Sequence, residues 1–545
     1  MKKILFPALI IFLALVLRLY DLGSIPPSLN WDEASLGYNA YAISQTLRDE
    51  HGEFLPIARF IAFGDYKPPG YIYLDALFVK ILGLSEFSVR LPSALAGALL
   101  VMVSYYLTRE LLYLDGGKSM ARGRNKYLPA LAALFLAISP WALQFSRGAF
   151  EANLATLFSG LGIYLFLRTI RTRGWLSCLL SGIFFALSMY TFNSHRVFVP
   201  LMIAALLLIF YRNIWSNRRQ FIVFGTVTAL LLLPMLPHIF SREGRLRFYE
   251  VTWLNDLKPI ELSNARITQD GDTWWSKILH NRRVVYTWEF LQHYTDHFRG
   301  DFLFYHGDVN PRLSVQSVGE LYWADLLLII PGIYYLLRRR SKATGVIFAW
   351  LLIAPIPAAV ARETPHALRI LPVLPIWSVI AAWGLAAIWE IAGSSRFQRA
   401  LGLTVAVIYA LSLLVYLRDY YFTYPEKYAL DWQYGYKEAV AYVAAHADEY
   451  DHISVSEAYG RPYIFFLFYE QYPPEKYWAT RSADRDWYGF WYVHGFAKLL
   501  FGTTSGDNGR WLYLREPGAT PKDAKLLKTI SAPDGRSIWE ISAKT

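Results

Sequence analysis

Residues 3–41 read KILFPALIIFLALVLRLYDLGSIPPSLNWDEASLGYNAY, an apolar run followed by two adjacent carboxylates, Asp32 and Glu33. An apolar segment of about 20 residues is long enough to cross a lipid bilayer as a helix. Ionised groups so close to a membrane face are costly unless they have a function. This stretch therefore predicts a membrane protein in which Asp32 and Glu33 have a functional role.

The whole chain has the composition of a protein that crosses the membrane many times. Of its 545 residues, 54% are hydrophobic and only 18% are charged, whereas soluble proteins are about 25% charged. The net charge of +11 comes from short basic clusters between apolar runs, as the positive-inside rule expects, so we expect no nucleic-acid partner. The single Cys178 excludes a disulfide framework or a cysteine-based metal site within one chain.

The apolar runs predict a polytopic α-helical protein with eleven transmembrane helices. We expect spans near 3–20, 88–112, 127–145, 150–170, 175–191, 197–211, 219–238, 321–338, 344–361, 369–391 and 399–418. Basic clusters mark the inner loops, namely Lys118 to Lys126, Arg168 to Arg173, Arg212 to Arg219, Arg338 to Lys342, and Arg396 with Arg399. The first run is expected to be an uncleaved span, because Arg18-Leu19-Tyr20-Asp21 is a poor signal-peptide cleavage site.

The remaining connections are predicted to lie outside the cell membrane. Segment 21–87 holds nine Asp or Glu against four Lys or Arg. Alternation of the spans then places the amino end in the cytoplasm and the carboxyl end outside. Residues 70–84 are also apolar, but Asp75 and Lys80 lie among them, so we interpret this segment as an interfacial or re-entrant helix.

Two long outer regions follow from this topology. Residues 239–320 form an outer loop rich in aromatic residues, whose Trp and Tyr side chains indicate either sugar stacking or an aromatic belt at the membrane surface. We expect a transmembrane domain over 1–420 and a polar α/β domain over 421–545. Within the second domain, the pattern predicts a helix over 433–447 and strands over 452–456, 511–515 and 536–542.

The predicted topology brings many charged side chains to one compartment. They are Asp32, Glu33, Asp65, Lys67, Arg90, Arg147, Glu151, His195, Arg196, Arg362, Glu363, His366 and Arg369. Convergent charge at one membrane face is typical of an active site. Each of these residues also has a structural explanation, such as an interface anchor, a helix cap or an ion pair.

The motifs near the amino end resemble those of a known superfamily. An acidic pair at the head of the first outer loop, GDYKPPG at 64–70 and RLPS at 90–93 resemble the GT-C glycosyltransferases. The resemblance is to the protein O-mannosyltransferase and aminoarabinose-transferase type, which use polyprenyl-phosphate sugars. It covers about residues 1–420 in architecture and implies a GT-C fold. The acceptor, whether protein, glycolipid or glycan, is left open.

Asp32 and Glu33 are the predicted catalytic residues. A carboxylate can take the proton from an acceptor hydroxyl as the hydroxyl attacks the sugar's anomeric carbon. In the resemblance, Asp32 matches the acidic residue taken as catalytic and Glu33 is its neighbour. The alternative is helix capping, because Ser28, Asn30 or Asp32 could cap a helix over 33–47.

Basic residues are the predicted ligands of the donor phosphate. Lys67 is the first of them, because the proline after it favours a fixed, extended backbone and the leaving lipid phosphate needs a nearby cation. The others are Arg90, Arg196, Arg362 and Arg369. Guanidinium can grip phosphate bidentately. The predicted substrate-binding residues are Asp65, Arg147, Glu151 and His366, and the spacing of Arg147 and Glu151 predicts a pair on one helix face.

We expect no obligatory cofactor. The triplets Asp270-Gly271-Asp272 and Asp484-Arg485-Asp486 have the spacing that can hold a divalent metal, but both lie in polar outer regions and are interpreted as solvated loops. They leave a metal-assisted mechanism open. The predicted function is an inverting transfer of a monosaccharide from a polyprenyl phosphate to an acceptor hydroxyl at the outer face of the plasma membrane. The alternatives are a flippase for a polyprenyl-linked glycan and a scaffold that presents the domain over 421–545.

Overall fold

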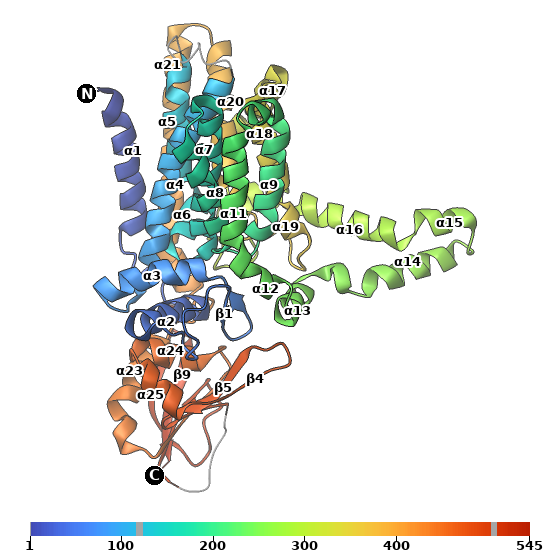
Figure 1. The fold of residues 1–545 in the computed structure, drawn as a ribbon. Coiled ribbons are helices and arrows are strands. Elements are labelled where there is room, and N and C mark those ends of the chain that lie inside the picture. The colour runs from blue at the N-terminus through green and yellow to red at the C-terminus, as the bar shows by residue number, and fades with distance from the viewer. Residues whose placement is uncertain (1, 116–123, 503–508, 545) are drawn as a thin grey trace. The chain divides into compact units, whose positions relative to one another are not determined.

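The computed structural model describes residues 2–115, 124–502 and 509–544 (Figure 1). Lys118 and Arg122 of the first predicted inner cluster lie outside these residues. The chain forms two compact units, each assembled from three stretches of sequence. The first unit contains 1–11, 100–142 and 155–412, and the second contains 12–99, 143–154 and 413–545.

Helices make up most of the structure. Their bounds are α1 Lys2–Leu19, α2 Trp31–Thr46, α3 Pro69–Leu82, α4 Glu86–Leu114, α5 Leu128–Ile138, α6 Pro140–Arg147, α7 Glu151–Thr172, α8 Trp175–Met189, α9 His195–Ile209, α10 Tyr211–Ser216, α11 Arg218–Leu232, α12 Leu236–Ile239, α13 Arg242–Val251, α14 Lys258–Gln269, α15 Trp274–Leu279, α16 Arg282–Asp296, α17 Trp323–Arg339, α18 Lys342–Ile353, α19 Ile356–Ala359, α20 Leu374–Ile391, α21 Ser395–Arg418, α22 Tyr424–Lys427, α23 Tyr436–His446, α24 Pro462–Tyr469 and α25 Pro474–Thr480.

Each of the eleven predicted spans coincides with one helix or with two consecutive helices. Within the described residues, six helices are long and apolar enough to cross a membrane, or seven if α5 and α6 form one bent span. The angle between α5 and α6 is 56°, and the break falls at Ser139, where the following proline disfavours a helical backbone. The prediction of a polytopic helical membrane protein is confirmed, while the count of eleven crossings stays a prediction.

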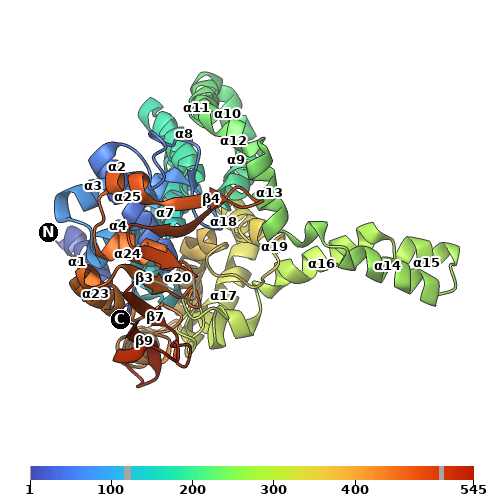
Figure 2. The same ribbon diagram turned by 90° about the horizontal axis from the view of Figure 1, so that it is seen from below.

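Residues 239–320, predicted as an outer loop, contain the helices α13 to α16. In Figures 1 and 2, α14, α15 and α16 extend away from α9, α11 and α18 of the same unit. The base of this hairpin is fixed to α18 and α19, since Tyr294 Oη donates to the carbonyl of Leu352 in α18 and Trp253 Nε1 donates to that of Ala359 in α19.

The second unit contains a seven-stranded sheet. The strands are β3 His452–Val455, β4 Ser482–Arg485, β5 Trp491–Phe496, β6 Leu499–Phe501, β7 Trp511–Arg515, β8 Lys525–Ser531 and β9 Ser537–Lys544, in the order β4-β5-β6-β3-β7-β9-β8. Strand β3 is parallel to β6 and β7, and the other pairs are antiparallel. The helix predicted over 433–447 and the three predicted strands are confirmed as α23, β3, β7 and β9.

Two amino-terminal elements of the same unit pack against this carboxyl-terminal domain. Helix α2 packs against α3 and α24. The short ribbon of β1 (Phe60–Ile61) and β2 (Tyr66–Lys67) is covered by the β4–β5 turn, because Ile61, Tyr66 and Phe490 form one apolar cluster. Tyr66 Oη also donates a hydrogen bond of 2.7 Å to the carbonyl of Tyr488. These contacts hold the helix that carries Asp32 and the strand that carries Lys67 within one unit.

Candidate active site

The amino end of α2 is capped by Asn30. Its Oδ1 accepts hydrogen bonds from the backbone N–H of Asp32 at 2.9 Å and of Glu33 at 3.1 Å. Glu33 Oε2 accepts the Asn30 N–H in return, which completes a capping box. Of the three candidate caps, Asn30 has this role, and the side chain of Asp32 is left for other contacts.

Asp32 forms an ion pair with Lys67. Lys67 Nζ lies 2.7 Å from Asp32 Oδ1 and 3.9 Å from Asp65 Oδ2. The lysine side chain is 3% exposed and the Asp32 side chain 45% exposed, so the carboxylate faces solvent while the ammonium is enclosed. Trp31 Nε1 donates to the other oxygen of Asp32, Oδ2, at 3.1 Å.

The charge of Lys67 is sustained by its surroundings. Burial alone lowers the pKa of a lysine, but the carboxylates of Asp32, Glu151 and Asp65 outweigh it and raise the pKa of Lys67 above its ordinary value. Lys67 is therefore a permanent cation at neutral pH. The structure brings together four predicted site residues here, from α2, β2, the turn before β2 and the start of α7.

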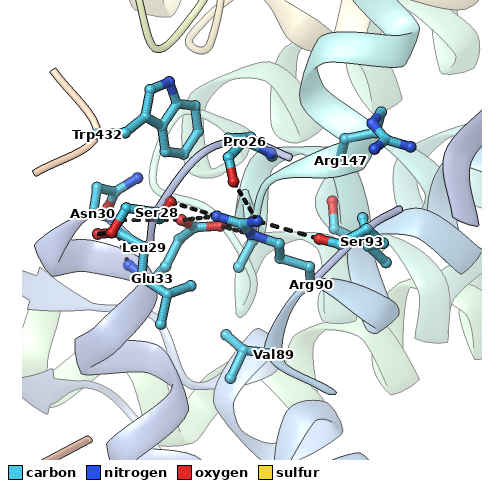
Figure 3. Close-up of polar contacts among 12 residues, drawn as sticks. Pro26, Ser28, Leu29, Asn30, Glu33, Val89, Arg90, Ser93, Arg147 and Trp432 are labelled. Atoms are coloured by element: carbon cyan, nitrogen blue, oxygen red, sulfur yellow. Dashed lines mark hydrogen bonds and ion pairs between the residues drawn. The ribbon is translucent and has the colours of Figure 1, made fainter. Parts of the chain in front are cut away.

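Glu33 and Arg90 form a buried network that corrects two sequence predictions (Figure 3). Arg90 is fully buried and donates to both oxygens of Glu33 and to the carbonyls of Leu22, Pro26 and Ser28. These bonds use all five N–H groups of the guanidinium, so none is left for a donor phosphate. Glu33 is 2% exposed and neutralises this arginine, which makes its role structural rather than catalytic.

The predicted pair of Arg147 and Glu151 is also corrected. Helix α6 ends at Arg147 and α7 begins at Glu151, so the two residues lie on different helices. Arg147 instead donates to the carbonyls of Leu17 and Arg18 in the last turn of α1 and to those of Asp21 and Ile25 after the helix. It also donates to the hydroxyl of Tyr420. It fixes the turn between α1 and α2, while Glu151 contributes its charge to the surroundings of Lys67.

The other predicted ligands lie in the first unit. Arg196 follows the first residue of α9 and donates to the carbonyl of Met189. Arg362 is half exposed and pairs with Asp256 at 2.7 Å. His366 and Arg369 lie in the loop after α19, where Asp308 Oδ2 accepts the N–H of Ala367.

The loop around Asp308 is held by buried polar groups. Burial raises the pKa of Asp308 to about 6, although backbone hydrogen bonds from Asn310 and Ala367 oppose this effect. Burial, with Arg369 nearby, lowers the pKa of His366 well below its ordinary value. The imidazole of His366 is therefore neutral. The donor and substrate roles predicted for Arg196, Arg362, His366 and Arg369 remain predictions.

The two Asp-x-Asp triplets make contacts typical of loops. Asp270 pairs with His280 at 2.8 Å, Asp484 pairs with His494 at 3.1 Å, and Asp486 accepts backbone N–H groups within its own turn. In the described part of the chain, no group of three or more His, Cys, Asp or Glu side chains is arranged to hold a metal ion. The expectation of no obligatory cofactor stays a prediction.

The sequence motifs assigned no role to Trp31, Gln433 or Gly460. Trp31 precedes Asp32 and contacts its carboxylate, while Gln433 and Gly460 contact Trp31 from 402 and about 430 positions along the chain. Trp31 could have been suspected from its adjacency to Asp32. The other two lie in a domain whose local sequence carries no recognisable motif for this role.

Comparisons with known proteins find a family match over part of the chain and solved structures that share its fold. Residues 66–239, about a third of the chain, match the family model described as dolichyl-phosphate-mannose-protein mannosyltransferase. An uncharacterised protein of Aquifex aeolicus (strain VF5) is 26% identical over 208 residues, which cover 36% of this chain. The chain spans 44% of that relative's length.

Two solved structures share the fold. ArnT from Cupriavidus metallidurans bound to undecaprenyl phosphate matches with a TM-score of 0.52 and 13% identity, over 99% of this chain and 98% of that chain. The archaeal oligosaccharyltransferase AglB from Archaeoglobus fulgidus, in complex with an inhibitory peptide and a dolichol-phosphate, matches with a TM-score of 0.51 and 14% identity, over 86% and 63%. These matches confirm the GT-C fold that the resemblance implies.

Proposed function

We propose that this protein is an inverting glycosyltransferase. It moves a monosaccharide from a polyprenyl-phosphate carrier to an acceptor hydroxyl at the extracytoplasmic face of the plasma membrane. The observation that carries the proposal is the contact between Asp32 and Lys67, a half-exposed carboxylate 2.7 Å from an enclosed ammonium. The reaction needs one group of each kind at one place, a base for the acceptor and a cation for the leaving phosphate.

In the proposed reaction, Asp32 takes the proton of the acceptor hydroxyl while the acceptor oxygen forms a bond to the anomeric carbon. The bond from that carbon to the phosphate oxygen breaks from the opposite side, so the configuration inverts. The lipid phosphate leaves with the electron pair, and the Lys67 ammonium stabilises its charge. A carboxylate oxygen can accept more than one hydrogen bond, so the bonds to Lys67 and Trp31 are compatible with a hydrogen bond from the acceptor hydroxyl.

The matched folds support the class of donor. ArnT was solved with undecaprenyl phosphate and AglB with a dolichol-phosphate, both of which are lipid phosphates. The family model over 66–239 is named for a dolichyl-phosphate-mannose donor, and its range begins at the strand that carries Lys67. We propose the same class of lipid carrier here, with Arg196, Arg362 and Arg369 as further candidates for phosphate contact and His366 for substrate contact.

Release of free polyprenyl phosphate tests this proposal. Purified protein is incubated with a panel of polyprenyl-phosphate sugars and candidate acceptors, beside Asp32→Asn and Lys67→Ala. General-base catalysis accounts for about 10²- to 10⁴-fold, so Asp32→Asn should lower kcat by that factor and leave donor affinity nearly unchanged. Lys67→Ala should weaken donor binding by about 10- to 100-fold, the effect expected for a charged contact.

Glu53→Gln serves as the control for loss of an acidic residue. Glu53 pairs with Arg59 at 2.8 Å in the same segment, and its loss should leave turnover unchanged. Full activity in Asp32→Asn would remove Asp32 as the base. Binding of a donor by all variants with no consumption by the wild type would instead favour a flippase.

A further inference from the structure

Trp31 connects Asp32 with the carboxyl-terminal domain. Its indole Nε1 donates to Asp32 Oδ2 at 3.1 Å, while Lys67 holds Oδ1 at 2.7 Å. A carboxylate that is held at both oxygens is fixed in one orientation. This orientation matters because a general base must lie within hydrogen-bond reach of the proton that it takes. The position of the Trp31 ring therefore sets the direction in which Asp32 faces an acceptor.

Gly460 fixes the ring of Trp31. A Cβ atom at Gly460 would lie 2.3 Å from Cε3 and from Cζ3 of Trp31, which is far inside van der Waals contact. The φ angle of Gly460 is +109°, in a region that residues with a side chain rarely adopt. The ring thus lies directly against the backbone of the turn between β3 and α24, with the edge of the Phe63 ring also in contact range.

Gln433 fixes the backbone of Trp31. Its Oε1 accepts the Trp31 N–H at 2.7 Å, and its Nε2 donates to the carbonyl of Tyr459 at 2.7 Å. The first N–H groups of a helix have no partner within the helix. Asn30 supplies acceptors for the second and third residues of α2, and Gln433 supplies one for the first. The amino end of α2 is therefore capped partly by the carboxyl-terminal domain.

We infer that the carboxyl-terminal domain is part of the catalytic centre, with Gly460 and Gln433 acting through Trp31 as positioning residues for Asp32. The domain sets the orientation of the base without contacting the reacting atoms itself. This inference rests on the proposed function, in which Asp32 is the base. It predicts that changes about 430 residues from Asp32 alter the chemical step rather than donor binding, because donor contact belongs to Lys67.

Gly460→Ala tests the inference, with Gly518→Ala as the matched control. Gly518 has a φ of +81° in the same domain, but nothing lies within 4 Å of a Cβ placed there. Both changes strain the backbone, and only the first displaces Trp31. Gly460→Ala should lower kcat by about 10- to 100-fold, the size expected from misplacing a catalytic group by about 1 Å. Its donor KM should match that of Gly518→Ala.

A double-mutant cycle separates positioning from a purely structural role. Trp31→Phe removes the indole donor and leaves a smaller ring, so Gly460→Ala should add no further loss of kcat in the Trp31→Phe protein. Additive losses would overturn the inference, as would equal kcat values for Gly460→Ala and Gly518→Ala. Gln433→Ala should likewise lower kcat more than it raises donor KM.

A spectroscopic measurement decides the inference even if no donor is consumed. The protein is labelled with 5-fluorotryptophan, and the ¹⁹F resonance of Trp31 is assigned among the 19 tryptophans by its absence in Trp31→Phe. Asp32→Asn and Gly460→Ala should each shift this resonance, and Gly518→Ala should not. An unmoved resonance in Gly460→Ala would overturn the positioning of Trp31. Absence of turnover in the wild type, with the expected shifts present, would instead count against the proposed function.

Discussion

At the scale of single residues, the enclosed ammonium of Lys67 gives a prediction about pH. Burial lowers its pKa, but Asp32, Glu151 and Asp65 raise it more, so the folded-state pKa lies above the unfolded value of about 10.4. A group whose pKa is raised by folding contributes stability that is complete below the unfolded pKa. This stability is lost only as the pH rises through the folded pKa.

The Lys67 charge should therefore support donor binding up to at least about pH 10, where an ordinary lysine has already begun to lose its charge. Asp32→Asn removes the carboxylate that raises this pKa most, so its alkaline loss of binding should begin at lower pH than in the wild type. Donor affinity measured against pH in both proteins tests this. A wild-type loss of binding between about pH 8 and 9 would contradict it.

The ion pair of Glu33 and Arg90 gives a prediction about stability. Both side chains are at least 98% buried, and breaking a buried pair by removing one charge costs about 3–5 kcal/mol. Glu33→Gln should therefore lower the melting temperature strongly. Lys437→Ala is the control, because Lys437 is 60% exposed in its pair with Glu86 and such pairs contribute about 0–1 kcal/mol. Equal melting temperatures for the two variants would show that the buried pair is not structural.

The sequence could identify Asp32 and Lys67 but could not distinguish the roles of the other charged residues. Asp32 and Lys67 stand in short motifs that resemble a known superfamily, and the structure places them in contact. Arg90 also stands in such a motif, yet its partner Glu33 is 57 positions away. From sequence alone, an arginine that pairs with a buried glutamate cannot be distinguished from an arginine that binds phosphate. The structure distinguishes them because it identifies the partner.

At the scale of elements, the helical hairpin α14–α16 gives a prediction about the membrane surface. Helix α16 presents three exposed apolar residues at helical spacing, Val284, Trp288 and Leu291. At the tip of the hairpin, Trp274 of α15 is 77% exposed. The tip also carries the exposed basic residues Lys277, Arg282 and Arg283. An apolar stripe with tryptophan and basic side chains is typical of a helix that lies in the headgroup region of a bilayer.

A single-cysteine probe tests contact of the hairpin with lipid. Cys178 is the only cysteine of the chain and is buried, so Cys178→Ser provides the background. A polarity-sensitive fluorophore at Trp288→Cys should be quenched by brominated lipids in reconstituted vesicles. The same fluorophore at Lys528→Cys, on the exposed strand β8, should not be quenched. Equal quenching at the two positions would exclude insertion of the hairpin.

The predicted strands were those that are mostly buried. Strands β3, β7 and β9 consist largely of buried residues, so their sequences are apolar enough to carry a signal. Strand β8 has one buried residue in seven, and β4 has none, which leaves no apolar run to detect. The hairpin α14–α16 was missed for the same reason, because few of its side chains are buried.

At the scale of the whole molecule, composition was enough to predict a polytopic helical protein, because a bilayer permits few alternatives to helices. The division into units could not be predicted in the same way. Each unit combines three separate stretches of chain, and helices such as α4 and α7 pass from one unit to the other. The division into a domain over 1–420 and a domain over 421–545 stays a prediction.

Cysteine labelling tests the predicted membrane topology. It shows whether an odd or an even number of crossings separates two positions, and which of them faces the outside. Five predicted spans separate Ser216, in a basic loop, from Lys522 in the carboxyl-terminal domain, so the two positions should lie on opposite sides. With Cys178→Ser as background, an impermeant maleimide should label Lys522→Cys on intact cells and Ser216→Cys only after permeabilisation. Labelling of both on intact cells would mean that the number of crossings between them is even. Phe54→Cys should label together with Lys522→Cys, and opposite behaviour of these two would mean that an odd number of crossings separates them, as expected if α3 crosses the membrane.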